Sequence, residues 1–180
     1  PDTELLVELS LQLPGERLSV LDAGTGSGAI AAAIASERPD WHVFASDFSA
    51  PALRVAVRNC SDRINLLQGN WLDAVGAASL DAVVSNPPYI EAGDPHLDGL
   101  TFEPRSALTA GPDGLNAIRA LITDARRTLR AGGALIVEHG WAQGAAVRAL
   151  MRVAGYVEVT SHHDLAGHER ATMAQSPGTP

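Results

Sequence analysis

The stretch LSVLDAGTGSGAIAAAIAS, residues 18–36, combines three features that together indicate an α/β fold. Residues 18–22 are mostly apolar and end in Asp22, as is typical of a short buried strand of a parallel sheet. Gly24, Gly26 and Gly28 follow, and an Ala/Ile-rich run to about Ser36 predicts a helix. Glycines let the backbone approach a ligand closely, and a helix N-terminus offers unpaired N–H groups. The loop therefore predicts a ligand site, although glycines also mark plain tight turns.

The composition indicates one globular domain. The chain has 180 residues, of which 46% are hydrophobic and 19% are charged. Its net charge of −8 argues against a nucleic-acid partner, because such proteins usually carry a basic face. The single cysteine, Cys60, fits a reducing compartment, and no apolar run is long enough to predict a membrane span. We therefore expect a cytoplasmic protein with no membrane partner.

A second acidic residue follows the next predicted strand, residues 41–46. Asp47 lies at the end of that strand, where a carboxylate can accept hydrogen bonds from both ribose hydroxyls of a nucleoside cofactor. Alternatively, Asp47 or Ser49 caps the helix predicted from Ala50 to Asn59. Beyond a third strand at residues 63–67 comes Trp71, which fits either the side of an adenine ring or the core beneath a loop.

Asn86-Pro87-Pro88-Tyr89 follows a fourth predicted strand, residues 81–85. The two prolines lack backbone donors and fix φ, so the strand must end there. In an open α/β sheet this edge is where ligands bind. The Asn86 amide and a neighbouring carbonyl offer one donor and two acceptors, which suits a planar NH2 group, and Tyr89 can stack beside it. The plain alternative is a turn, since Asn and Pro are ordinary turn residues.

The rest of the chain predicts further helices and strands without a metal site. Helices are expected at the N-terminus from about Thr3, from Asp113 or Gly114 to about Leu129, and from Gln143 to Ala154. A turn at Gly132-Gly133 leads into a strand at residues 134–138, and another strand is expected at residues 157–160. We expect no metal at His162, His163 and His168, because no second ligand set accompanies them.

Seven motifs occur along the chain in an order that resembles one family. They are Pro1-Asp2-Thr3-Glu4, Asp22-Ala23-Gly24-Thr25-Gly26-Ser27-Gly28, Asn86-Pro87-Pro88-Tyr89-Ile90, Phe102-Glu103-Pro104, Gly111-Pro112-Asp113-Gly114-Leu115, Glu138-His139-Gly140, and Asp164-Leu165-Ala166-Gly167 with Glu169-Arg170. This series is similar to that of the HemK/PrmC family, which methylates the side-chain amide of the glutamine in the Gly-Gly-Gln motif of peptide chain release factors. The resemblance spans nearly the whole chain.

The resemblance implies a fold, a cofactor and a substrate. The fold is a doubly wound, mostly parallel seven-stranded sheet of the S-adenosylmethionine-dependent methyltransferase type, with an antiparallel last strand around residues 169–173. The cofactor is S-adenosyl-L-methionine and the partner is a release factor, bound by a monomer. Residues 1–180 correspond to the catalytic domain, and the family's N-terminal helical docking domain is absent from this chain.

The resemblance also implies roles for individual residues. The methionine end of the cofactor lies at Gly24, Thr25, Gly26, Ser27 and Gly28, with Asp47 at the ribose, Trp71 near the adenine, and Asn86 between cofactor and substrate. The substrate amide is held by Asn86 and the Pro87 carbonyl, next to Pro88 and Tyr89. The connection from Ile90 to Leu108, with Glu103, is expected to cover the target glutamine.

Two other functions remain open from the sequence. An adenine or other amino-group methyltransferase acting on nucleic acid uses the same tetrapeptide, although the acidic charge speaks against it. A cofactor-binding module that is inactive without its missing domain is the second alternative.

Overall fold

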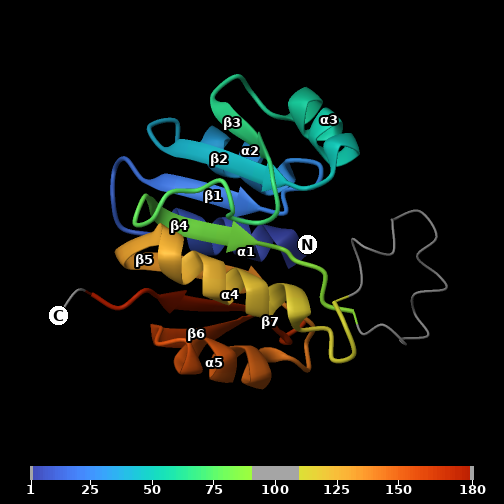
Figure 1. Ribbon diagram of the computed structural model, residues 1–180, viewed down its shortest axis with the longest axis vertical. Helices are drawn as coiled ribbons and strands as arrows, with labels where there is room; N and C mark the ends of the chain where they lie inside the picture. The colour runs from blue at the N-terminus through green and yellow to red at the C-terminus, as the bar shows by residue number, and fades with distance from the viewer. Residues whose placement is uncertain (1, 91–109, 179–180) are drawn as a thin grey trace.

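A seven-stranded sheet forms the centre of the protein, and its strands run in the order β3-β2-β1-β4-β5-β7-β6 (Figure 1). The computed structural model describes residues 2–90 and 110–178. Strands β1 to β5 pair in parallel, whereas β7 is antiparallel to both β5 and β6. The predicted doubly wound sheet with an antiparallel last strand is confirmed.

The strands are β1 (Ser19–Ala23), β2 (His42–Asp47), β3 (Ile64–Gln68), β4 (Leu80–Ser85), β5 (Leu129–Glu138), β6 (Val157–His163) and β7 (Glu169–Gln175). The helices are α1 (Asp2–Leu11), α2 (Ala29–Glu37), α3 (Ala50–Asn59), α4 (Asn116–Thr128) and α5 (Gly144–Val153). The first four strands lie within about one residue of their predicted bounds. The fourth helix begins later than expected, and β6 is longer.

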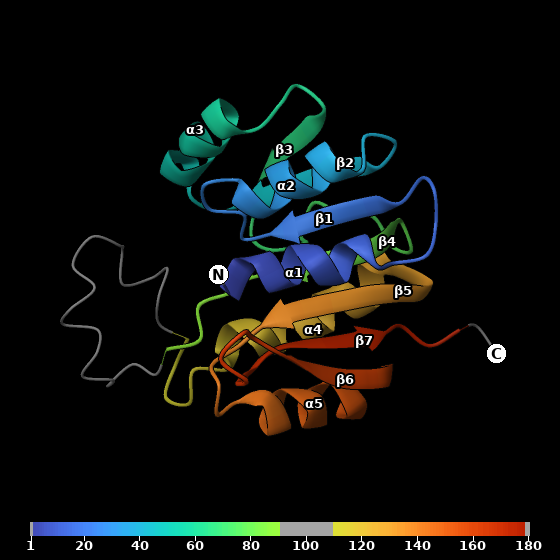
Figure 2. The ribbon, with the colours of Figure 1, turned by 180° about the vertical axis from the view of Figure 1, so that it is seen from behind.

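Helices cover both faces of the sheet. Helices α4 and α5 lie in front of it in Figure 1, and α1 and α2 lie on the face seen in Figure 2. Each face has its own core: Ile118 and Leu121 of α4 pack on one side, and Leu6 of α1 and Ile34 of α2 on the other. Each such fully buried side chain contributes about 1.5–3 kcal/mol to the free energy of unfolding. The strands between the two layers are therefore held rigidly.

The start of β5 differs from its prediction at Gly132-Gly133. Leu80 pairs with Leu129, and two residues further on Ala82 pairs with Ala134, so β5 contains an irregularity at this point. Gly132 has a φ of 77°, which favours glycine. The predicted turn is therefore part of strand β5, and the chain pairs with β4 on both sides of it.

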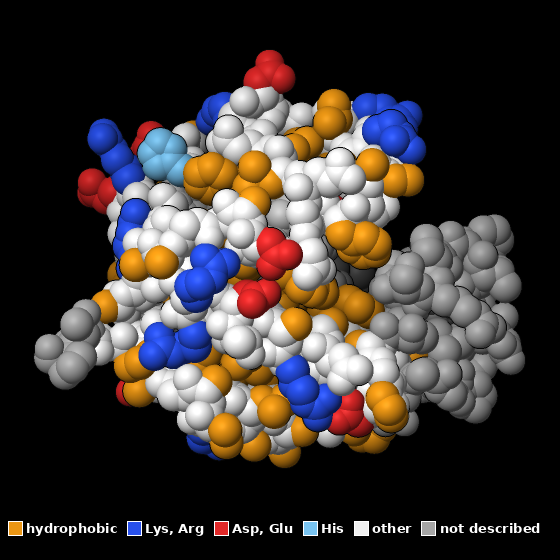
Figure 3. Space-filling view, in the orientation of Figure 1, with side chains coloured by type: hydrophobic (Ala, Val, Ile, Leu, Met, Phe, Trp, Pro, Cys, Tyr) orange, Lys and Arg blue, Asp and Glu red, His pale blue; other side chains and the backbone are white. Residues whose placement is uncertain are grey.

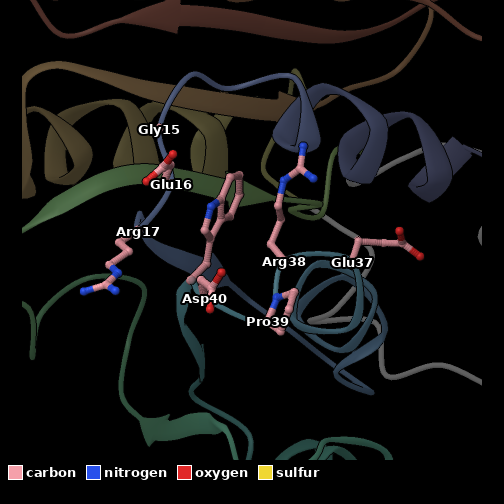
Figure 4. Close-up of a pocket in the computed structure, with 8 residues that line it drawn as sticks. Gly15, Glu16, Arg17, Glu37, Arg38, Pro39 and Asp40 are labelled. Atoms are coloured by element: carbon pink, nitrogen blue, oxygen red, sulfur yellow. The ribbon is translucent and has the colours of Figure 1, made fainter.

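The parallel strands bring the predicted site residues to one edge of the sheet. Ala23 is in register with Ser46, and Ser85 with Val137, so β1, β2, β4 and β5 all end close together. A hollow between residues 15–17 and 37–41 lies at the opposite edge, where β1 and β2 begin (Figure 4). Within residues 2–90 and 110–178, no helix is long and apolar enough to cross a membrane.

Candidate active site

The glycine loop ties the end of β1 to the end of β2. The backbone N–H groups of Gly24 and Thr25 donate to the Ser46 carbonyl at 2.8 and 2.9 Å. Gly24, Gly26 and Gly28 have φ values of 73°, 56° and 83°, which only glycine adopts without strain. A Cβ added at Gly26 would meet nothing within 4 Å, so the loop has open space beside its backbone there. Ser27 at the tip of the loop is exposed.

Asp22 supports this loop through buried hydrogen bonds. It is completely buried, and its Oδ2 accepts hydrogen bonds from Thr25 Oγ1 at 2.5 Å and from the Ala31 N–H at 3.2 Å. Gly28 begins helix α2 and has no side chain to cap it, so Asp22 supplies an acceptor from β1 instead. Burial raises the pKa of Asp22 to about 6, and the nearby Asp47 carboxylate adds to the shift.

Asp47 points its carboxylate at the glycine loop. Its Oδ2 accepts from the Gly26 N–H at 2.9 Å, and its Oδ1 accepts from the Ser49 N–H at 2.8 Å. The cap of α3 is Ser49, whose Oγ accepts from the Ala52 N–H at 3.3 Å. Ser49 is therefore the cap of α3, and the ribose role of Asp47 stays a prediction. Each carboxylate oxygen of Asp47 keeps a second lone pair for a further donor.

Two aromatic residues lie at this part of the edge. Trp71 packs against the core and also against Gly24, because a Cβ added at Gly24 would lie 2.9 Å from Trp71 Cζ3. The core interpretation of Trp71 is confirmed, and its place beside an adenine ring stays a prediction. Phe48, which was not predicted as a site residue, directly follows Asp47 and is 61% exposed. The sequence signal for Phe48 was its position directly after the acidic residue that ends a predicted strand.

Asn86-Pro87-Pro88-Tyr89 leaves the end of β4 beside the glycine loop. Ser85 Oγ donates to the Ala23 carbonyl at 2.6 Å, which joins β4 to the end of β1. Pro87 is buried, while Asn86, Pro88 and Tyr89 are half-buried. The tetrapeptide therefore lies at the open edge, with Asn86 next to the end of β1.

Tyr89 is held at both ends by residues that follow β5. Its hydroxyl donates to Glu138 Oε1 at 3.3 Å, and its carbonyl accepts from Gln143 Nε2 at 3.0 Å. Glu138 is 2% exposed, and the neighbouring His139 is fully buried with a pKa lowered by burial. The tetrapeptide is thus a fixed structure rather than a freely hinged turn. The contact of Gln143 was not foreseen from the sequence.

These residues fit a charged nucleoside cofactor. The open backbone at Gly26, the start of α2 and the remaining lone pairs of Asp47 lie together, with Phe48 and Trp71 near them. Such a set offers N–H donors, acceptors for ribose hydroxyls and aromatic faces for a base. The residues that the structure describes contain no group of three or more His, Cys, Asp or Glu side chains able to hold a metal. The connection predicted to cover the substrate, with Glu103, lies outside the described residues except for Ile90.

Comparison with solved structures places the fold in one class. The chain superposes on a methyltransferase from Pyrococcus furiosus with a TM-score of 0.71 at 19% identity, covering 99% of this chain and 83% of that one. A ribosomal protein L11 methylase from Lactobacillus delbrueckii subsp. bulgaricus gives a TM-score of 0.67 at 20% identity, covering 99% and 78%. Residues 1–100 also match the family model "Methyltransferase small domain". The fold is that of an S-adenosylmethionine-dependent methyltransferase.

Sequence comparison narrows this class to a family. The chain is 50% identical to a release factor glutamine methyltransferase of Xylella fastidiosa (strain Temecula1) over 186 residues, which is 98% of this chain and 67% of that protein. It is 43% identical to that of Escherichia coli (strain K12) over 182 residues, 97% of this chain and 66% of that protein. The chain belongs to the release factor glutamine methyltransferase family, and it spans about two thirds of the length of these relatives. The resemblance to this family that the motifs indicated is thereby confirmed.

Proposed function

We propose that this chain transfers the methyl group of S-adenosylmethionine to the side-chain amide nitrogen of the glutamine in the Gly-Gly-Gln motif of peptide chain release factors. Membership of the family supports the reaction and the substrate. The observation that carries the proposal is the position of Asn86, at the open edge directly beside the end of β1 and its glycine loop.

The cofactor would be held mainly by residues 22–49. The backbone of Gly24 to Gly28 would face the methionine end, and the Asp47 carboxylate would accept from the ribose hydroxyls. Phe48 and Trp71 would pack beside the adenine. When bound, the cofactor supplies an electrophilic methyl group on a positively charged sulfur. The arrangement of Asp47 supports this assignment, because both of its oxygens already accept from backbone N–H groups and keep their direction.

The substrate amide would be held by Asn86 and the Pro87 carbonyl. A carboxamide nitrogen is a poor nucleophile, because its lone pair is delocalised into the carbonyl. Two acceptors on its NH2 hydrogens would fix the nitrogen in line for attack and favour the partial positive charge that develops there. Pro88 and Tyr89 would line the same site, and exclusion of water from the site would strengthen these interactions.

Charge favours a protein substrate over a nucleic acid. The chain carries a net charge of −8, and on the face shown in Figure 3 basic side chains are scattered among acidic ones. Nucleic-acid binding relies on a basic surface that neutralises phosphates. We propose that the chain acts as a monomer in the cytoplasm, where release factors work. Residues 1–180 would be the catalytic part, and a helical docking domain of the kind that the family carries would strengthen binding of the release factor.

The test is methyl transfer from radiolabelled S-adenosylmethionine to a purified release factor. The matched control is the same release factor with the motif glutamine replaced by alanine, and DNA and RNA serve as alternative acceptors. We expect label only in the peptide that contains the unmodified motif. Label in nucleic acid, or equal labelling of the control release factor, would contradict the proposal. Cofactor binding without any transfer would favour an inactive binding module.

A further inference from the structure

One glutamine side chain joins three chain segments next to the proposed amide site. Gln143 Nε2 donates to the Tyr89 carbonyl at 3.0 Å and to the Asp113 carbonyl at 3.2 Å. Gln143 Oε1 accepts from the Gly140 N–H at 2.9 Å. The segments are the end of the tetrapeptide, the approach to α4 and the turn between β5 and α5, which gather at the edge on the right of Figure 1.

The packing around this amide leaves little freedom. Gly114 has a φ of 68°, and a Cβ added there would lie 2.2 Å from the Tyr89 carbonyl oxygen and 2.7 Å from Gln143 Nε2. The chain therefore passes directly over the hydrogen bond, where only glycine fits. Gly114 and Gln143 together fix the main chain of Tyr89 from two sides.

The position of Gln143 on its helix shows that the side chain does not serve α5. Gln143 is the N-cap residue directly before the helix, and its side chain makes no capping hydrogen bond. Ser, Thr, Asp and Asn are the residues that normally cap a helix there. A glutamine, being one methylene longer than asparagine, instead reaches Tyr89 across the edge. The residue type thus fits the bridge better than it fits the helix.

The tetrapeptide needs such an external support. Pro87 and Pro88 have no backbone N–H, so they cannot donate hydrogen bonds to neighbouring strands. Tyr89 is the first residue after them, and its carbonyl is bound by Gln143. A displacement at Tyr89 would be passed through the stiff prolines to the Pro87 carbonyl and Asn86.

We infer that Gln143 is a positioning residue for the proposed methyl transfer, holding Tyr89 so that Asn86 and the Pro87 carbonyl meet the substrate amide correctly. The inference rests on the proposed function. A misplacement of about 1 Å at a reacting group can lower turnover by roughly a hundredfold. The hydrogen-bond partners of Gln143, which are Tyr89, Asp113 and Gly140, lie outside residues 22–49. It should therefore affect turnover without affecting cofactor affinity.

The first experiment measures kcat and KM for a release factor at saturating cofactor, and cofactor affinity by calorimetry. Gln143→Leu removes all three hydrogen bonds at nearly constant size. Gln143→Ser also removes them but introduces a residue that can cap α5, which protects the fold. For both variants we expect kcat to fall by about 10- to 100-fold, with the cofactor Kd changed less than about twofold.

The second experiment uses a change of charge and pH. Gln143→Glu keeps an acceptor for Gly140 but turns a carboxylate toward two carbonyl oxygens, which raises the pKa of the introduced carboxyl above its usual value of about 4.3. Below that pKa the carboxyl is protonated and regains an O–H donor. The activity of Gln143→Glu relative to the unmodified chain should therefore rise as the pH falls. Gln12→Glu makes the same change at an exposed residue beyond α1, and its relative activity should not vary with pH.

Three outcomes would overturn the inference. One is turnover of Gln143→Ser and Gln143→Leu within about twofold of the unmodified chain. Another is a parallel loss of cofactor affinity, because it would mean a general loosening of the site. The third is a flat pH response of Gln143→Glu at reduced activity. Failure of the proposed function looks different, since the unmodified chain itself would then transfer no methyl group to the motif glutamine.

Discussion

The two halves of the site are built in different ways. The half around the glycine loop is made by one continuous segment, residues 22–49, in which Asp22 and Asp47 bind backbone groups of that same segment. The half around Asn86 is assembled from distant parts of the chain, since Tyr89 is held by Glu138 and Gln143. The proposed cofactor site is thus built largely from local hydrogen bonds, whereas the proposed substrate site depends on contacts between distant segments. Changes in one half should therefore leave the other half largely intact.

The largest difference between the effects on turnover and on cofactor affinity is expected for Asn86→Ala. Removal of this side chain should lower single-turnover methylation by about a hundredfold or more, on the scale of one preorganised transition-state contact. Cofactor affinity should change much less than turnover, because the proposed cofactor contacts lie mainly in residues 22–49. The melting temperature should change little, because Asn86 lies at the open edge and is only half-buried. Asn65→Ala, at an exposed position of β3, is the matched control. Near-normal turnover of a folded Asn86→Ala variant would mean that the tetrapeptide is only a turn.

For Asp47→Ala we expect the reverse, a loss of cofactor affinity. Loss of hydrogen bonds to a charged group should weaken cofactor binding by about 1.5–3 kcal/mol. The change is measured by calorimetry with S-adenosylmethionine or its demethylated product. Asp40→Ala is the control, because Asp40 is an exposed acid at the opposite edge of the sheet (Figure 4). Unchanged affinity of Asp47→Ala would remove this residue from the cofactor site.

Much of the half around the glycine loop (the local half) could be predicted from the sequence. Little of the half around Asn86 (the assembled half) could be. Strand, glycine loop, helix and the acid after β2 follow one another in the sequence, so spacing alone indicated them. Which of Asp47 and Ser49 caps α3 could not be predicted, because both lie within hydrogen-bonding reach of the same turn. The contacts of Gln143 depend on segments that meet only in the folded sheet. The irregularity at Gly132-Gly133 needed the register with β4 for the same reason.

Asp22 allows the local half to be tested by pH. Its pKa of about 6 in the folded protein lies above the value of about 3.9 for an unfolded chain. The folded state therefore binds more protons between these values, and the contribution of Asp22 to stability falls as the pH rises from 4 to 6 and stays low above that. Asp22→Asn should remove this dependence and raise the free energy of unfolding at pH 8 by on the order of 1–2 kcal/mol.

Urea unfolding at pH 4.5, 6 and 8 provides the measurement for Asp22→Asn. The difference between the variant and the unmodified chain should grow mostly between the first two values and only slightly between pH 6 and 8. A difference that does not change with pH would mean that folding does not raise the pKa of Asp22.

The smallest effect is expected for Tyr89→Phe, which sharpens the description of the assembled half. The ring remains, but the buried Glu138 loses a hydroxyl donor at 3.3 Å, a long hydrogen bond. We expect a loss of about 1 kcal/mol in the free energy of unfolding and a much smaller effect on turnover than that of Asn86→Ala. Thermal melts and single-turnover assays of the two variants side by side provide the measurement. Equal losses of turnover would show that the hydroxyl itself takes part in the site.

The antiparallel strand β7 also constrains how the chain folds during synthesis. Strand β7 lies between β5 and β6, although it is the last of the three to leave the ribosome. Until residues 169–175 emerge, β5 has an open edge and β6 has no neighbour in the sheet. An unpaired edge of this kind is a template for pairing with other chains. The growing chain therefore depends on its final strand, and a nascent chain that stalls before Glu169 should be captured by chaperones or aggregate.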